Sequence, residues 1–309
     1  MLRVHLPRFN RVFAATITCG FATLACSPPA SSTSHVGATP AAAVFEPAVV
    51  STRLPEFAIT FTPDGRSLYF GRASADRATL TIMMADKVDG RWTNTRVAPF
   101  SGRYRDVDPF VTPDGRRLYF SSDRPRLGAT ARGLHTWFVE RTANGWSEPI
   151  DPGEPLNSDS LDVFVSVSRA GVLLFSSRRD GHLRVYSTRF DRGKWEAPRP
   201  VRFGAITEGA SNAMISPSGR FVVLVMDQPG QGSDLFVSCR SASGWSEPRR
   251  LSEAVNSRYA DFAPALDPGE SMLYFTSERP GVVAAQPDSV RPPGDIYQIS
   301  ARAAGLRCP

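Results

Sequence analysis

The sequence predicts an all-β fold, a five-bladed β-propeller built from four-stranded blades. The first observation is a series of tight turns whose glycines are spaced by 50, 56, 48 and 50 residues: Gly65, Gly115, Gly171, Gly219 and Gly269. The second is a parallel series of tryptophans, spaced by 54, 49 and 50 residues: Trp92, Trp146, Trp195 and Trp245. Four short strands repeated about every 40 to 50 residues are typical of propeller blades.

Each unit contains a turn between two strands. Thr62-Pro63-Asp64-Gly65 precedes Leu68-Tyr69-Phe70, and Thr112-Pro113-Asp114-Gly115 precedes Leu118-Tyr119-Phe120. Proline fixes φ at the first corner of such a turn, and glycine supplies the positive φ that closes it. The flanking segments are rich in β-branched and aromatic residues, which favours strands. The five repeats are predicted at about 56–100, 106–150, 162–201, 210–251 and 260–300.

The ring is predicted to close through its N-terminal segment. The fifth repeat lacks an outermost strand, whereas the segment Phe45–Val50 precedes the first repeat and resembles the Trp-Ser-Glu-Pro segments, with Phe45 in place of tryptophan. Closure of this kind removes the exposed sheet edges that invite aggregation. We therefore expect the propeller over residues 45–309, with the N-terminal strand completing the last blade.

Residues 1–25 have the features of an export signal. Arg3, Arg8 and Arg11 precede an apolar stretch of 14 residues that ends before Cys26, and this stretch is too short to span a bilayer. Alanine directly before Cys26 predicts lipidation of that cysteine, while cleavage at an ordinary signal-peptidase site stays open. Residues 26–44 are predicted to be a flexible tether. We expect an exported lipoprotein of the outer membrane or cell surface that faces the periplasm, with a soluble periplasmic protein as the alternative.

Composition excludes several classes of protein. Hydrophobic residues make up 41% of the chain, enough for a packed core. Without residues 1–25 the chain keeps 33 basic and 30 acidic residues, a balance that does not favour nucleic-acid binding. No spacing typical of a zinc site occurs, and the sequence predicts neither a metal nor a cofactor. Cys239 and Cys308 either form a disulfide in an oxidising compartment or remain two separate thiols.

The repeat resembles a known family. Thr/Ser-Pro-Asp-Gly, Leu-Tyr-Phe and a following Ser-x-x-Arg, as in Ser121-Ser122-Asp123-Arg124, are similar to the WD40-like Pro-Asp repeat of TolB-type periplasmic propellers. The resemblance covers nearly all of residues 45–300 and implies the propeller fold. TolB itself has an additional N-terminal domain and six blades, neither of which this sequence displays, so the resemblance implies no role in the Tol system.

A propeller binds at the mouth of its channel, on loops carried by a rigid ring. One mouth is formed by the connections into each innermost strand and by the loops between the second and third strands. The residues predicted to form a ligand-binding face there are Asp106, Asp108, Asp162, Asp261, Arg124, Arg178 and Arg279. The competing interpretation is structural: the repeated acids accept hydrogen bonds that tie the blades together, and the repeated arginines form ion pairs.

Two functions follow from these residues. The first is a non-catalytic binding or scaffold propeller of the cell envelope, acting as a monomer, which engages a protein or glycan partner through its loop face and contacts the membrane only through its lipid anchor. The alternative is a hydrolase of glycans or other small substrates that uses Glu56, Asp106 and Asp162, because glycosidic cleavage requires paired carboxylates. Replacing these acids by amides distinguishes the two hypotheses.

Overall fold

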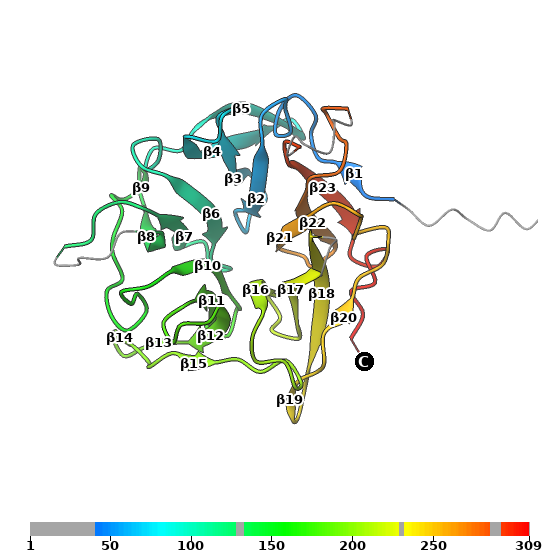
Figure 1. Cartoon of the computed structure of the whole chain (residues 1–309). Coiled ribbons are helices and arrows are strands. Elements are labelled where there is room, and N and C mark those ends of the chain that lie inside the picture. Colours follow the sequence, from blue (N-terminus) through cyan, green and yellow to red (C-terminus); the bar gives the residue numbers. More distant parts are fainter. Residues whose placement is uncertain (1–40, 128–132, 229–231, 285–291, 309) are drawn as a thin grey trace, which may run out of the picture. The chain divides into compact units, whose positions relative to one another are not determined.

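Five antiparallel sheets surround a central axis in the computed structural model, which describes residues 41–127, 133–228, 232–284 and 292–308 (Figure 1). Blade 1 contains β2 (Glu56–Phe61), β3 (Ser67–Ala73), β4 (Leu80–Val88) and β5 (Arg91–Val97). Blade 2 contains β6 (Asp106–Val111), β7 (Arg117–Ser122), β8 (His135–Thr142) and β9 (Gly145–Trp146). The predicted all-β, five-bladed fold is therefore confirmed.

The remaining blades follow in chain order. Blade 3 contains β10 (Asp162–Val167), β11 (Leu173–Ser177), β12 (Arg184–Thr188) and β15 (Arg199–Pro200), with the hairpin β13 (Phe190–Asp191) and β14 (Lys194–Trp195) beside it. Blade 4 contains β16 (Ala210–Ile215), β17 (Phe221–Gln228) and β18 (Gly232–Ser241), which pairs with both β19 (Gly244–Trp245) and β20 (Arg249–Arg250). Blade 5 contains β21 (Asp261–Leu266), β22 (Met272–Ser277), β23 (Asp295–Ser300) and β1 (Ala43–Val44).

The N-terminal strand closes the ring, as predicted. β1 pairs antiparallel with β23, with Ala43 opposite Gln298, and the Phe45 N–H donates to the carbonyl of Ile296 at 2.7 Å. The closing strand lies earlier than predicted, because residues 46–50 form a turn in which the N–H of Val50 donates to the carbonyl of Glu46. Phe45 still fills the predicted apolar site, since its side chain is 4% exposed and packs edge-on against Tyr274.

The innermost strands share one irregularity that shapes the channel. β2, β6, β10, β16 and β21 contact one another in this order, and β21 returns to β2. Each carries a bulge at its third residue, where the pairing to the second strand shifts and φ is positive: Ala58, Asp108, Phe164, Asn212 and Ala263. A bulge bends its strand and increases the local twist. The equivalence places Asp108 in the same structural position as four uncharged residues.

Apolar clusters join neighbouring blades. One cluster combines Tyr69 and Ile82 of blade 1 with Phe120 of blade 2, and the Trp146 Nε1 of blade 2 donates to the Tyr69 hydroxyl of blade 1 at 2.8 Å. Aromatic rings bury large apolar areas, so such contacts between blades contribute strongly to the stability of the ring. The tryptophan series therefore supplies packing within and between blades.

The C-terminal segment returns to blade 4. Cys239 on β18 forms a disulfide with Cys308, with Cα atoms 5.6 Å apart, and Arg249 donates to the carbonyl of Gly305 at 2.7 Å. The sequence left this pairing open. The disulfide joins blade 4 to the segment that follows blade 5. No helix in the described ranges has the length and apolar character needed to cross a membrane.

Candidate functional site

Four of the predicted acids, Glu56, Asp106, Asp162 and Asp261, lie at the start of the innermost strands, where each forms an ion pair inside its own blade. Arg124 Nη2 lies 2.7 Å from Asp106 Oδ1, and Arg279 Nη2 lies 2.7 Å from Asp261 Oδ1. In blade 1, Arg72 Nε lies 2.8 Å from Glu56 Oε1. All three carboxylate side chains are 0% exposed.

The same pairs also hold the chain segment that enters each blade. Ser257 donates to Asp261 through its N–H at 2.6 Å and its hydroxyl at 2.9 Å, and Ser101 donates its hydroxyl to Asp106 at 2.8 Å. Arg124 donates to the carbonyl of Phe100, which precedes its blade. Because buried carboxylates require such donors, this arrangement gives the acids a structural role in fixing the connections between blades.

One predicted arginine occupies a different position. The residue that pairs with Asp162 is Arg179, at 2.8 Å, and Arg178 is exposed. In blades 2, 3 and 5 the pairing arginine stands two residues after the serine that faces the acid across the sheet, and in blade 3 that serine is Ser177. Counted from Ser176, the pattern Ser-x-x-Arg ends at Arg179, so the predicted Arg178 lies one residue too early. Blade 4 has Ala210 at the acid's position and no such pair.

The raised pKa of Glu56 suits a general acid, but the position of its carboxylate does not. Burial raises its pKa from 4.5 to about 7, although hydrogen bonds from Thr52 and the charge of Arg72 lower it. A general acid must reach the atom that it protonates. The Glu56 carboxylate is instead enclosed and accepts hydrogen bonds from Thr52 and Arg72.

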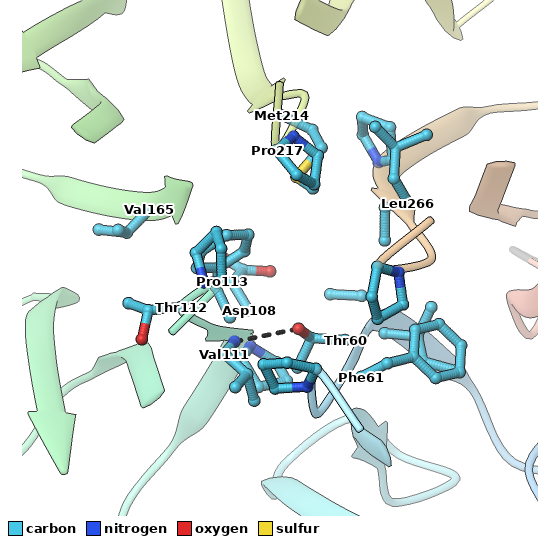
Figure 2. A pocket seen from close by; sticks show the side chains of 18 of the residues that line it. Thr60, Phe61, Asp108, Val111, Thr112, Pro113, Val165, Met214, Pro217 and Leu266 are labelled. Atoms are coloured by element: carbon cyan, nitrogen blue, oxygen red, sulfur yellow. Dashed lines mark hydrogen bonds between the residues drawn. The ribbon is translucent and has the colours of Figure 1, made fainter. Parts of the chain in front are cut away.

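A cavity of about 180 Å³ occupies the other end of the channel (Figure 2). All five blades line it, with residues such as Phe61, Val111, Val165, Met214 and Leu266. Six prolines also line it, four of them from the turns between first and second strands: Pro63, Pro113, Pro217, Pro268, Pro109 and Pro264. This mouth lies opposite the predicted ligand-binding face, because it is formed by the first turn of each blade rather than by the loops after the second strand.

The cavity ends inside the channel. Ala58 and Phe164 line it, and they pack together with Ala263 as a buried cluster from blades 1, 3 and 5. These are bulge residues at the middle of the channel, so their side chains close the inner end of the cavity. The cavity is therefore open toward the turns and blocked toward the ion pairs.

Asp108 is the one predicted ligand-face residue that lines this cavity. Its carboxylate has no hydrogen-bond or ion-pair partner among the described residues, and burial raises its pKa from 3.8 to about 7. The apolar residues and prolines around Asp108 were not among the site residues predicted from the sequence. The signal that could have found them is the set of turn prolines, because the first turns of all blades converge on one mouth.

A larger hollow of about 590 Å³ lies between blades 2 and 3. Arg117 lines it, 2.9 Å from Glu140 and with its guanidinium 5.2 Å from the ring centre of Phe190. The charge of Arg117 thus has partners within the protein. Among the described residues there is no group of three or more metal-binding side chains at this or any other place.

Comparisons with known proteins support the fold. A putative TolB from Agrobacterium tumefaciens is 15% identical, with a TM-score of 0.51 over 81% of this chain and 78% of the other. A GH62 hydrolase solved with xylotriose is 9% identical, with a TM-score of 0.52 over 84% of this chain and 97% of the other. TolB from Acinetobacter baumannii is 15% identical, with a TM-score of 0.49; the match spans 81% of this chain but only 55% of that protein. No family model and no curated protein matches the sequence.

Proposed function

We propose that this chain is a non-catalytic binding propeller of the cell envelope, which holds a partner protein by a side chain or segment inserted into the channel cavity. The observation that carries the proposal is the cavity itself, which is lined by all five blades and open at one end. Ligand sites are typically concave, mostly apolar and equipped with a few polar groups.

The lining favours a protein partner over a glycan. Proline, alanine, valine, leucine and phenylalanine dominate the wall, and Thr60 and Thr112, its two hydroxyl residues, already make hydrogen bonds within the protein. A sugar would lose hydrogen bonds to water that such a wall does not replace. An apolar side chain has no such hydrogen bonds to lose.

Hydrolysis by Glu56, Asp106 and Asp162 is the weaker candidate. Each of these carboxylates is enclosed and satisfied by an arginine and by serine or threonine donors. The cavity contains a single carboxylate, that of Asp108, whereas glycosidic cleavage uses two. The likeness to the GH62 hydrolase concerns the fold.

The envelope location is part of the proposal. It is supported by the signal-like residues 1–25, and the disulfide between Cys239 and Cys308 is typical of oxidising compartments. Cys26 lies outside the described residues, and we propose that its lipid is the chain's only contact with the membrane. Mass spectrometry of the purified full-length protein tests this directly: a lipid mass is expected on Cys26 and absent from Cys26→Ser.

The binding proposal is tested by crosslinking in cells followed by affinity capture of the full-length protein. Met214→Trp fills the cavity, and Leu127→Trp adds the same side chain at an exposed site outside it. We expect a specific partner with the wild type and with Leu127→Trp, and its loss with Met214→Trp when thermal melting shows that this variant folds. Ala265→Val is the second cavity variant if Met214→Trp does not fold.

Two results would contradict the proposal. One is a partner that binds the folded cavity variants as well as it binds the wild type. The other is a partner lost in Arg178→Ala alone, which would place binding on the opposite face. Hydrolysis of a glycan library by the wild type, abolished in Glu56→Gln, would support the alternative function.

A further inference from the structure

The channel cavity contains one unpaired charge. Asp108 lies at the third residue of β6, level with the residues that close the cavity's inner end. The equivalent positions in the other blades are occupied by Ala58, Phe164, Asn212 and Ala263, none of which carries a charge. The ring architecture therefore does not require an acid at this position.

No cation among the described residues neutralises Asp108. Arg169 is the one basic residue among those that line the cavity, and it lies toward the mouth with its side chain 58% exposed. Its guanidinium donates to the carbonyl of Pro268 at 2.9 Å and lies 3.7 Å from Glu270. A carboxylate held in an apolar cavity without a partner is costly when ionised, so a cation supplied from outside would be bound in preference to water.

The cavity also restricts the shape of what enters. It is closed at the Asp108 end and lined by apolar side chains between there and the mouth. The known capacity of apolar cavities gives a scale: one of roughly 150 Å³ takes a benzene-sized molecule, so about 180 Å³ accommodates one long side chain. An occupant must therefore have an apolar stem and a positive tip.

We propose, on the basis of the function proposed above, that the cavity receives a lysine side chain of the partner protein, with its ammonium group against Asp108 and its four-carbon stem along the apolar wall. Lysine buries such a stem while keeping its charge at the end. Arginine fits less well, because its guanidinium presents five N–H donors to a cavity whose one unused acceptor side chain is Asp108.

The lysine side chain without its backbone is n-butylammonium, which serves as the probe. Met214 lines the cavity, so the wild-type protein with 13C-labelled methionine methyl groups reports binding by NMR. Met214→Leu assigns the signal. We expect butylammonium to shift the Met214 methyl signal in a saturable way at pH 8, and n-butanol, of the same length without the charge, to bind at least tenfold more weakly.

Asp108→Asn is the critical variant. Asparagine already occupies the same backbone position in blade 4, as Asn212 with a φ of 44°, so the substitution preserves the fold. We expect it to weaken butylammonium binding at least tenfold without affecting butanol. Asp159→Asn makes the same chemical change at an exposed carboxylate outside the cavity and is expected to leave both affinities unchanged.

The pH dependence provides a second readout. Because the Asp108 pKa is about 7, its ionised fraction falls about tenfold between pH 8 and pH 6, and butylammonium affinity should fall about tenfold with it. Arg169, the other ionisable group that faces the cavity, stays protonated throughout. Equal binding of butanol and butylammonium, or undiminished butylammonium binding by Asp108→Asn, would overturn the proposal while leaving the cavity as an apolar binding site.

The source of the ammonium group is tested on the complex. A carbodiimide links a carboxylate directly to an amine that contacts it, so treatment of the captured complex should yield an Asp108 crosslink to a lysine ε-amine of the partner. A crosslink to the partner's α-amine, or a retained partner with no Asp108 crosslink, would contradict the assignment to lysine. The butylammonium titration needs no partner, so failure of the binding function and failure of this inference are distinguishable.

Discussion

Removing one member of a buried ion pair should destabilise the propeller far more than removing an exposed one. Asp106 and Arg124 are the clearest case, because their side chains are 0% and 8% exposed and their charged atoms are 2.7 Å apart. Asp106→Ala leaves the Arg124 guanidinium enclosed against the rings of Phe120 and Trp137, at 4.8 and 5.3 Å. An uncompensated buried charge costs about 3–5 kcal/mol.

This loss can be measured by urea unfolding and by thermal melting. At about 2–4 °C per kcal/mol for a domain of this size, Asp106→Ala should lower Tm by roughly 6–20 °C. The matched control is Asp86→Ala, which removes the partner of Arg96 at the same distance of 2.7 Å, where the two side chains are 30% and 48% exposed. Exposed pairs contribute at most about 1 kcal/mol.

A double variant separates the charge effect from the loss of packing. In Asp106→Leu with Arg124→Met both charges are replaced by apolar groups, so we expect it to be more stable than either single substitution. If Asp106→Ala lost no more stability than Asp86→Ala, the structural role assigned to the four acid–arginine pairs would be wrong, and their recurrence would need a functional explanation.

Three further predictions concern other parts of the molecule. The pKa of Asp108 is 3.8 when the chain is unfolded and about 7 when it is folded, so the folded state binds an additional proton between these pH values. The stability of the wild type therefore falls as the pH rises from 4 to 8. Asp108→Asn removes this loss, so its stability relative to the wild type in urea unfolding should increase by up to about 4 kcal/mol from pH 4 to pH 8. Replacing Cys239 and Cys308 by serine opens a disulfide that spans 69 residues and should cost about 4 kcal/mol by chain entropy, whereas an unchanged midpoint of chemical unfolding would indicate that the thiols are unpaired. Phe45→Ala should lower the free energy of unfolding by about 3–5 kcal/mol, because its ring is buried where the propeller closes. Phe190→Ala, at a ring that is 46% exposed, should lower it by less than half as much. Equal losses of stability in thermal melts would contradict the assigned packing.

The sequence predicted the blades because their turns carry local chemistry. Pro-Asp-Gly specifies a tight turn by itself, and Gly65, Gly115, Gly171 and Gly219 adopt the positive φ that this turn requires. The fifth turn differs, because Glu270 rather than Gly269 has positive φ. This one-residue shift explains why Asp261, eight residues before Gly269, is nevertheless equivalent to the acids that stand nine residues before their glycines.

The cavity was harder to predict, because it depends on contacts between residues far apart in the chain. Nothing local distinguishes Asp106, which is enclosed by its arginine, from Asp108, which lines the cavity two residues later. The alternation of side chains along a strand predicts only that both point to the same side, and the bulge at Asp108 breaks even that rule. Placing the two acids required the register of β6 against β7.

Blade 5 is the one blade that no continuous stretch of the chain contains, since β1 and β23 join residues 43 and 298. During synthesis β1 must therefore remain unpaired until β23 has been made. Loss of β1 exposes the edge of β23, and loss of β23 exposes the edge of β22. Trimming at either end of the chain should therefore leave blade 5 with an open edge that favours aggregation. The pairing of β1 with β23 therefore forms only in a chain that contains both strands, and an open edge in blade 5 indicates an incomplete propeller.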